Sequence, residues 1–142
     1  MHRRESIMQA VVSALTGLAT TASRVTRSRA WPVSSLPALT IAQGADVFSD
    51  QQHLGDVMRE LTVEITAHAQ GGSTLETDLN AISAEVYAAL LDDYNLALNY
   101  VHGVDIVSDS APDIEGEQNE TTARMSMQFN VLYEHSSTST EA

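Results

Sequence analysis

The chain has 142 residues, of which 43% are hydrophobic and 18% charged, and its net charge is −12. This composition supports one folded core and excludes a chain that is disordered throughout. The absence of cysteine excludes a disulfide framework, a thiolate zinc site and a cysteine nucleophile. No apolar run reaches the roughly 18 residues of a membrane-spanning helix, and the acidic charge disfavours binding to nucleic acid or anionic lipid.

Basic and acidic residues are unevenly distributed. Residues 1–33 contain five arginines and one acidic residue, Glu5, whereas the rest of the chain has two arginines against 18 acidic residues. Every basic residue other than histidine is arginine, which forms bidentate pairs with carboxylates and is common at protein interfaces. The two parts of the chain could therefore attract each other between copies. Alternatively, the arginines could pair within one molecule.

Residues 3–18 are predicted to form an amphipathic helix, because apolar residues recur every three or four positions. This stripe comprises Ile7, Val11, Ala14, Leu15 and Leu18. An alternative is a secretory signal cleaved near Ala22, since two arginines precede the apolar stretch. Polar residues interrupt that stretch at helical intervals, and this favours the helix.

Three segments between residues 23 and 70 have the patterns of strands. Residues 23–31 alternate with a period near two. Residues 39–42 follow Pro37 as a short strand that ends in a turn at residues 43–46. Residues 57–70 alternate between apolar and polar side chains, which predicts a long strand with one face on the core.

A second helix is predicted to follow this long strand. Residues 73–76 read Ser-Thr-Leu-Glu, a capping box in which Ser73 and Glu76 satisfy free amide groups at the helix start. The helix is expected to continue to about Leu91. Its apolar stripe comprises Leu75, Leu79, Ile82, Val86 and Leu90.

The C-terminal part is predicted to contain two further strands. Residues 99–107 are rich in Val, Ile and Tyr, and residues 123–133 alternate strictly. Between them, residues 109–120 read as an acidic loop. The pattern as a whole predicts an α+β fold: a mainly antiparallel twisted sheet of about four to five strands with two helices packed on one face. Residues 1–135 are expected to form this single domain, and residues 136–142 a disordered C-terminal tail.

No motif for catalysis or for metal or cofactor binding is present. The chain lacks a glycine-rich phosphate loop, a nucleophile elbow and a paired-histidine zinc helix. His68 and His102 could approach each other on adjacent strands, but no third ligand accompanies them. The acidic residues after Asp109 place Ile114 where a calcium-binding loop requires glycine. We therefore expect no enzymatic activity, cofactor or metal; the alternative is a small ligand-binding α+β domain that uses residues 105–120.

The order of elements and several short sequence words resemble the tail-terminator (minor tail, tail-completion) proteins of long-tailed bacteriophages. The resemblance extends over residues 4–134. It rests on an arginine-rich first helix, an arginine-studded strand at residues 24–31, and a strand that contains Arg59-Glu60-Leu61. It also includes the Leu36-Pro37-Ala38-Leu39 element, the Glu85-Val86 and Leu90-Leu91 pairs, and the closing words Met127-Gln128-Phe129-Asn130 and Val131-Leu132-Tyr133.

This resemblance implies a virion protein at the head-proximal end of the tail, assembled in the host cytoplasm. Such a protein closes into a hexameric ring on the finished tail tube, stops tube polymerisation and presents the surface to which the head attaches. Its implied partners are copies of itself, the tail-tube protein and a head-tail connector or neck protein, with no membrane. DNA would pass through the lumen without specific binding. The related neck and head-completion proteins share this size and architecture, so a connector role is an alternative.

Four arginines are predicted to lie at protein interfaces: Arg24, Arg27, Arg29 and Arg59. A closed ring joins two different patches of neighbouring copies. The basic N-terminal part and the acidic remainder of the chain would supply two such unlike patches. This assignment is an expectation from charge patterning and from the resemblance together.

Overall fold

The computed structural model describes residues 2–21, 25–27, 37–48, 56–71, 75–92, 96, 98–115 and 122–136. Within these ranges the chain forms two helices, α1 (Arg3–Leu15) and α2 (Leu75–Asp92). The strands are β1 (Val25–Arg27), β2 (Ala38–Phe48), β3 (Asp56–Gln70), β4 (Val101–Asp109), β5 (Asp113–Glu115) and β6 (Thr122–Ser136). This composition confirms the predicted α+β class.

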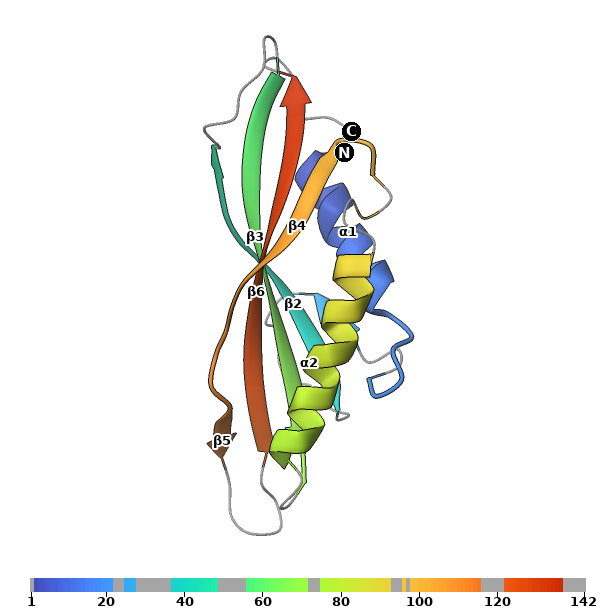
Figure 1. Cartoon of the computed structure of the whole chain (residues 1–142), viewed down its shortest axis with the longest axis vertical. Helices are drawn as coiled ribbons and strands as arrows, with labels where there is room; N and C mark the ends of the chain where they lie inside the picture. The colour runs from blue at the N-terminus through green and yellow to red at the C-terminus, as the bar shows by residue number, and fades with distance from the viewer. Residues whose placement is uncertain are drawn as a thin grey trace.

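The six strands form one twisted sheet in the order β1-β2-β3-β6-β4, with β5 also paired to β6. Only β1 and β2 are parallel, and the other described pairs are antiparallel. Both helices lie on the same side of the sheet, α1 beside its upper half and α2 beside its lower half (Figure 1). The prediction of two helices on one face of a mainly antiparallel sheet is therefore confirmed, although the sheet has six strands rather than the predicted four to five.

Strands β3 and β6 form the long central ladder of the sheet. Their register is continuous from the pair Asp56 and Ser136 to the pair Gln70 and Thr122. Along β6, and along β3 from Leu61 to Ala69, side chains that face the helices are buried, and those between them remain partly or fully accessible. At the start of β3 the pattern breaks, because Met58 is buried on the other face and Arg59 faces the helices. This alternation is why both strands could be predicted from the sequence, because a sustained two-residue period fits a strand with one covered face.

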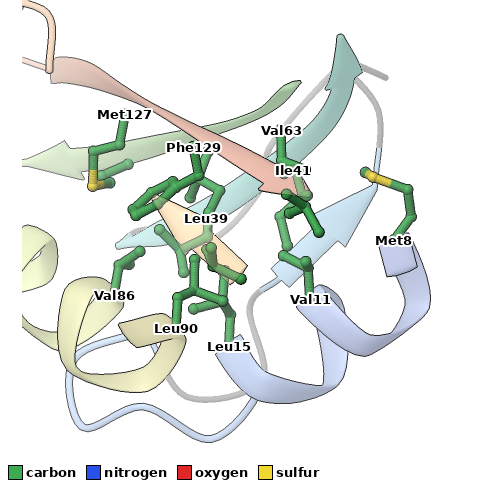
Figure 2. Close-up of a cluster of buried hydrophobic side chains, with 14 of the residues drawn as sticks. Met8, Val11, Leu15, Leu39, Ile41, Val63, Val86, Leu90, Met127 and Phe129 are labelled. Atoms are coloured by element: carbon green, nitrogen blue, oxygen red, sulfur yellow. The ribbon is translucent and has the colours of Figure 1, made fainter. Parts of the chain in front are cut away.

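The core lies between the helices and the inner face of the sheet. Figure 2 shows side chains of α1, α2, β2, β3 and β6 meeting in it. The buried residues of α1 are Ile7, Met8, Val11 and Leu15. Those of α2 include Leu75, Leu79, Ile82, Val86 and Leu90, as predicted. Helix α1 thus contributes four buried side chains to the core, as its amphipathic pattern predicted.

Helix α1 is shorter than predicted. It ends at Leu15 rather than Leu18, and Thr16 caps it with an extended backbone. Gly17 follows with a φ of 94°, a left-handed conformation that glycine adopts without strain. The helical apolar spacing continues past the true end, but glycine at this position terminates the helix.

The turn predicted at residues 43–46 is wrong. Strand β2 continues through this segment to Phe48, with a register shift between Gln43 and Asp46 against β3. Three steps along β2 from Gln43 to Asp46 oppose two steps along β3, so the segment is a β-bulge. A side-chain carbon on Gly44 would lie 3.1 Å from the Thr62 backbone oxygen, so a larger residue there would require Thr62 to shift.

Three other predicted segments differ in extent from the structure. The loop predicted at residues 109–120 contains the short strand β5, whereas residues 116–121 lie outside the described residues. Of the strand predicted at residues 23–31, the structure describes only β1. The predicted tail begins at Ser136, which is the last residue of β6, and residues 137–142 lie outside the described range, as does Ser73 of the capping box.

Candidate interface

Arg27 lies on the short outermost strand β1. It pairs in register with Ile41 of β2, and its guanidinium forms an ion pair with the carboxylate of Glu5 on α1. Both side chains of this pair are more than a third exposed. The contact ties α1 to the edge of the sheet while leaving part of the guanidinium accessible. Arg24 and Arg29, predicted to accompany Arg27 at an interface, lie outside the described residues.

Arg59 lies on β3 and faces the helix side of the sheet. Its register neighbours are Phe48 on β2 and Tyr133 on β6. The guanidinium carbon lies 4.3 Å from the centre of the Phe48 ring, and Nε donates to Nε2 of His135 at 2.8 Å. The Arg59 side chain is only 20% exposed. Arg59 thus contacts Phe48 and His135 within its own protomer.

Asp46 is the centre of the cluster that contains Arg59. We name Arg4, Asp46, Arg59, Tyr133 and His135 the Asp46 cluster. Asp46 Oδ2 accepts from Arg4 Nη1 at 3.0 Å and from the Tyr133 hydroxyl at 2.6 Å, and it lies 3.7 Å from Arg59 Nη1. The Asp46 side chain is 5% exposed, and its Oδ1 has no hydrogen-bond partner among the described residues. The cluster therefore joins α1 to three strands.

The β-bulge in β2 is what brings Asp46 into this cluster. Before the bulge, Leu39 and Ile41 face the core; after it, Asp46 is opposite Leu61, which also faces the core. Burial raises the pKa of Tyr133, and the hydrogen bond to Asp46 raises it further. The phenol thus remains protonated and able to donate. One feature of the sequence could have indicated a polar partner near Tyr133, because a tyrosine buried in a strand usually requires a partner for its hydroxyl.

The N-terminus of α1 is fixed to the sheet near the Asp46 cluster. His2 caps the helix by accepting from the Arg4 amide at 2.9 Å, and burial, followed by the positive charge of Arg4, lowers the pKa of His2. Arg3 donates to the Glu134 carbonyl at 2.6 Å and lies 4.5 Å from the centre of the Tyr100 ring. Arg3 and Arg4 of α1 therefore make contacts within their own protomer.

The polar face of the sheet is largely satisfied by pairs across strands. Thr62 donates to Asn130 at 3.1 Å, and the hydroxyls of Thr66 and Ser126 lie 3.2 Å apart. His68 Nε2 is 3.1 Å from the Thr40 hydroxyl. Burial, and secondarily the charge of Arg124, lowers the pKa of His68.

The approach of His68 and His102 considered from the sequence is wrong. The two histidines lie on strands that are not neighbours, because β6 lies between β3 and β4. On β3, His68 is opposite Arg124 of β6. On β4, His102 lies between two residues that pair with Tyr133 and Leu132 of β6. Eight residues of β6 separate these positions, about 26 Å along a strand. No group of three potential metal ligands occurs among the described residues.

The acidic strands β4 and β5 form one edge of the sheet. Asp113 pairs with Arg124 at 3.1 Å, and Asp109 accepts from the Tyr87 hydroxyl. Burial raises the pKa of Tyr87, and its bond to Asp109 does so further. Asp105 is exposed and has no ion pair among the described residues. Of the acids in the predicted loop, Asp109 and Asp113 thus lie along an exposed strand edge.

Large exposed apolar side chains gather at both edges of the sheet. On β4 and β5 they are Ile106, Val107 and Ile114, and on β2 they are Val47 and Phe48. Of the described residues of this kind, only Leu91 on α2 lies elsewhere. Exposed clusters of this sort are typical of surfaces that contact other proteins.

Comparisons with known proteins bear on the fold. No protein-family model and no curated protein sequence matches the chain. Its structure is similar to that of a chain in a solved structure described as "Virion of native gene transfer agent (GTA) particle", with a TM-score of 0.55 and 15% sequence identity. The similarity covers 94% of this chain and 96% of the other. Among the described residues, no helix is long and apolar enough to cross a membrane.

Proposed function

We propose that the protein is a structural, non-enzymatic component of a phage-like virion. The observation that carries this proposal is the structural similarity to a chain of a gene transfer agent virion, because it extends over nearly the whole of both chains.

Within the virion, we propose a ring, hexameric as the resemblance implies, at the head-proximal end of the tail. There it would stop polymerisation of the tail-tube protein and present the surface for a connector or neck protein. The unlike edges of the sheet support this role. One edge is acidic and the other carries arginines, and a ring requires each protomer to offer two different, complementary patches.

The charge of the protein is compatible with DNA passage through such a ring. The chain has 19 acidic and seven basic residues, and the polar face of the sheet carries acids such as Glu60 and Glu64 on β3. Adhesion to DNA requires arginine or lysine contacts to phosphates. A lumen with few such contacts would let the genome slide through without being held.

Particles made without this protein would test the proposed role. Loss of a tail terminator should yield tubes of uncontrolled length that lack heads, because nothing stops polymerisation. Loss of a neck connector, the alternative role, should leave tails of normal length and unattached heads. Electron microscopy distinguishes these outcomes, and the wild-type gene supplied in trans is the control. Complete, infectious particles of normal length would contradict both roles.

A further inference from the structure

Two histidines accept hydrogen bonds from arginine residues at the place where α1 meets the sheet. His135 Nε2 accepts from Arg59 Nε at 2.8 Å, and His135 Nδ1 lies 2.7 Å from the carbonyl oxygen of Ser136. Because a carbonyl oxygen only accepts, Nδ1 carries the proton of this ring and Nε2 carries none. His2 Nδ1 likewise accepts from the Arg4 amide at 2.9 Å. Both rings are therefore held in the neutral form.

Protonation would abolish both of these acceptors, since an imidazolium has a hydrogen on each ring nitrogen. A proton on Nε2 of His135 would point at the Nε hydrogen of Arg59. Two positively charged donors would then face each other at a residue that is only 5% exposed. A proton on Nδ1 of His2 would face the Arg4 amide and leave the first turn of α1 without its cap.

The charges around these rings are mainly positive. Arg4 of α1 and Arg59 of β3 both pair with one carboxylate, that of Asp46 on β2, which leaves an excess of one positive charge. Tyr133 of β6 also donates to Asp46, and its raised pKa keeps it uncharged. Asp46 favours a proton on His2, but burial, followed by the charge of Arg4, outweighs this attraction and lowers the pKa of His2. Arg59 and the second histidine lower it further.

We propose that the contacts of His2 and His135 form an acid-sensitive latch, which holds the N-terminal end of α1 on the sheet at neutral pH and releases it in mild acid. At neutral pH both rings are acceptors, and the two arginines converge on Asp46. With α1 released, both rings would be exposed to water and would take up protons first as the pH falls below about 6.5. The equilibrium therefore shifts toward release in acid. Release would uncover the first buried side chains of the helix, Ile7 and Met8.

Hydrogen–deuterium exchange of the full-length protein tests this latch, because it reports the opening of α1 and of α2 separately. Amide protection is measured at pH 7 and at pH 5 and is corrected for the intrinsic effect of pH on exchange. Peptides from α1 should lose protection by about tenfold relative to peptides from α2, which corresponds to lowering the pKa of one histidine by one unit in the closed state.

The diagnostic variant combines His2→Asn with His135→Gln. Asparagine can still cap α1, and glutamine can still accept from Arg59 Nε, but neither side chain gains a charge in acid. Helix α1 of this variant should keep its protection at pH 5. His2→Asn alone should retain part of the acid effect, and it provides the test if the double variant does not fold. His68→Gln, whose ring contacts Thr40 of β2, is the control and should open as the wild type does.

Three results would overturn the proposal. An equal loss of protection in α1 and α2 would show that acid acts on the whole fold. A wild-type loss of protection in both His2→Asn and the double variant would exclude the two histidines. Greater protection of α1 at pH 5 would mean that a protonated ring donates to Oδ1 of Asp46, which has no partner among the described residues, and that acid tightens the contact.

Discussion

Asp46 and Tyr133, 87 residues apart in the chain, are joined by a hydrogen bond of 2.6 Å from the tyrosine hydroxyl to Oδ2 of the carboxylate. Tyr133 is fully buried on β6, and Asp46 reaches it because of the bulge in β2. Arg4 and Arg59 supply the positive charge that makes a buried carboxylate tolerable. The first helix, two central strands and a sheet edge are thus fixed at one point.

Asp46→Asn should lower the free energy of unfolding by about 2 kcal/mol, because hydrogen bonds to a charged group contribute ~1.5–3 kcal/mol. The partial exposure of Arg4 and Arg59 keeps this loss below that of a fully buried ion pair. Urea unfolding monitored by circular dichroism measures this loss in the free energy of unfolding. Asp113→Asn, which removes an exposed ion pair, is the matched control and should change stability by less than about 0.5 kcal/mol. Equal losses in the two variants would refute the central role of Asp46.

Gly44→Ala should destabilise the protein by about 1–2 kcal/mol, since the added carbon meets the backbone and side chain of Thr62 at 3.1–3.2 Å. Gly103→Ala on β4 is the control, because a side-chain carbon there meets nothing within 4 Å. Its stability should stay the same or rise by up to about 1 kcal/mol. Thermal unfolding measures the stability of both variants relative to the wild type. If Gly44→Ala were as stable as the wild type, the bulge would be able to relax around the added carbon, and the prediction would be wrong.

His68 should make the protein less stable in mild acid. Its pKa in the folded protein is below the ordinary value of 6.5, so the unfolded chain takes up a proton first as the pH falls through that value. The free energy of unfolding should therefore fall between about pH 6.5 and the lower pKa of the folded state. His68→Gln should reduce this loss, measured by urea unfolding from pH 7 to pH 5. Identical slopes for the wild-type protein and His68→Gln would exclude His68 as the cause.

Replacing Arg27 and Arg29 together with glutamate should block self-assembly while leaving the protomer folded. Arg27 pairs with Glu5, so loss of that intramolecular pair is a competing explanation. Glu5→Gln removes the same pair and keeps both arginines, and it should assemble normally. Sedimentation velocity reports assembly, and circular dichroism reports folding. Assembly of the double variant at the wild-type concentration would contradict an interface role for these arginines.

The regular parts of the fold could be predicted from hydrophobic periodicity. Strand β6, helix α2 and strand β3 from Leu61 onward each follow one period, so the buried face could be read directly. The bulge in β2 could not be predicted, because the segment Gly44-Ala45-Asp46 has the composition of a turn. Only pairing with β3, distant in sequence, keeps this segment extended.

The candidate site was harder to predict than the fold. Charge patterning singled out Arg27 and Arg59 as candidate interface residues but did not predict their ion-pair partners. Glu5 comes close to Arg27, and Asp46 to Arg59, only after the sheet forms. The exposed edges depend on strand order, which periodicity does not encode. Val107 and Val47 look like ordinary core residues in sequence, and only the topology places them at the open sides of the sheet.

The solution mass of the purified protein tests the ring most directly. Light scattering would be recorded at several protein concentrations and at low and moderate salt, because contacts between acidic and arginine-bearing edges weaken as salt screens them. The account predicts a mass near six protomers, or a monomer that shifts toward six as the concentration rises. A strict monomer at every concentration and salt condition would contradict self-assembly into a ring.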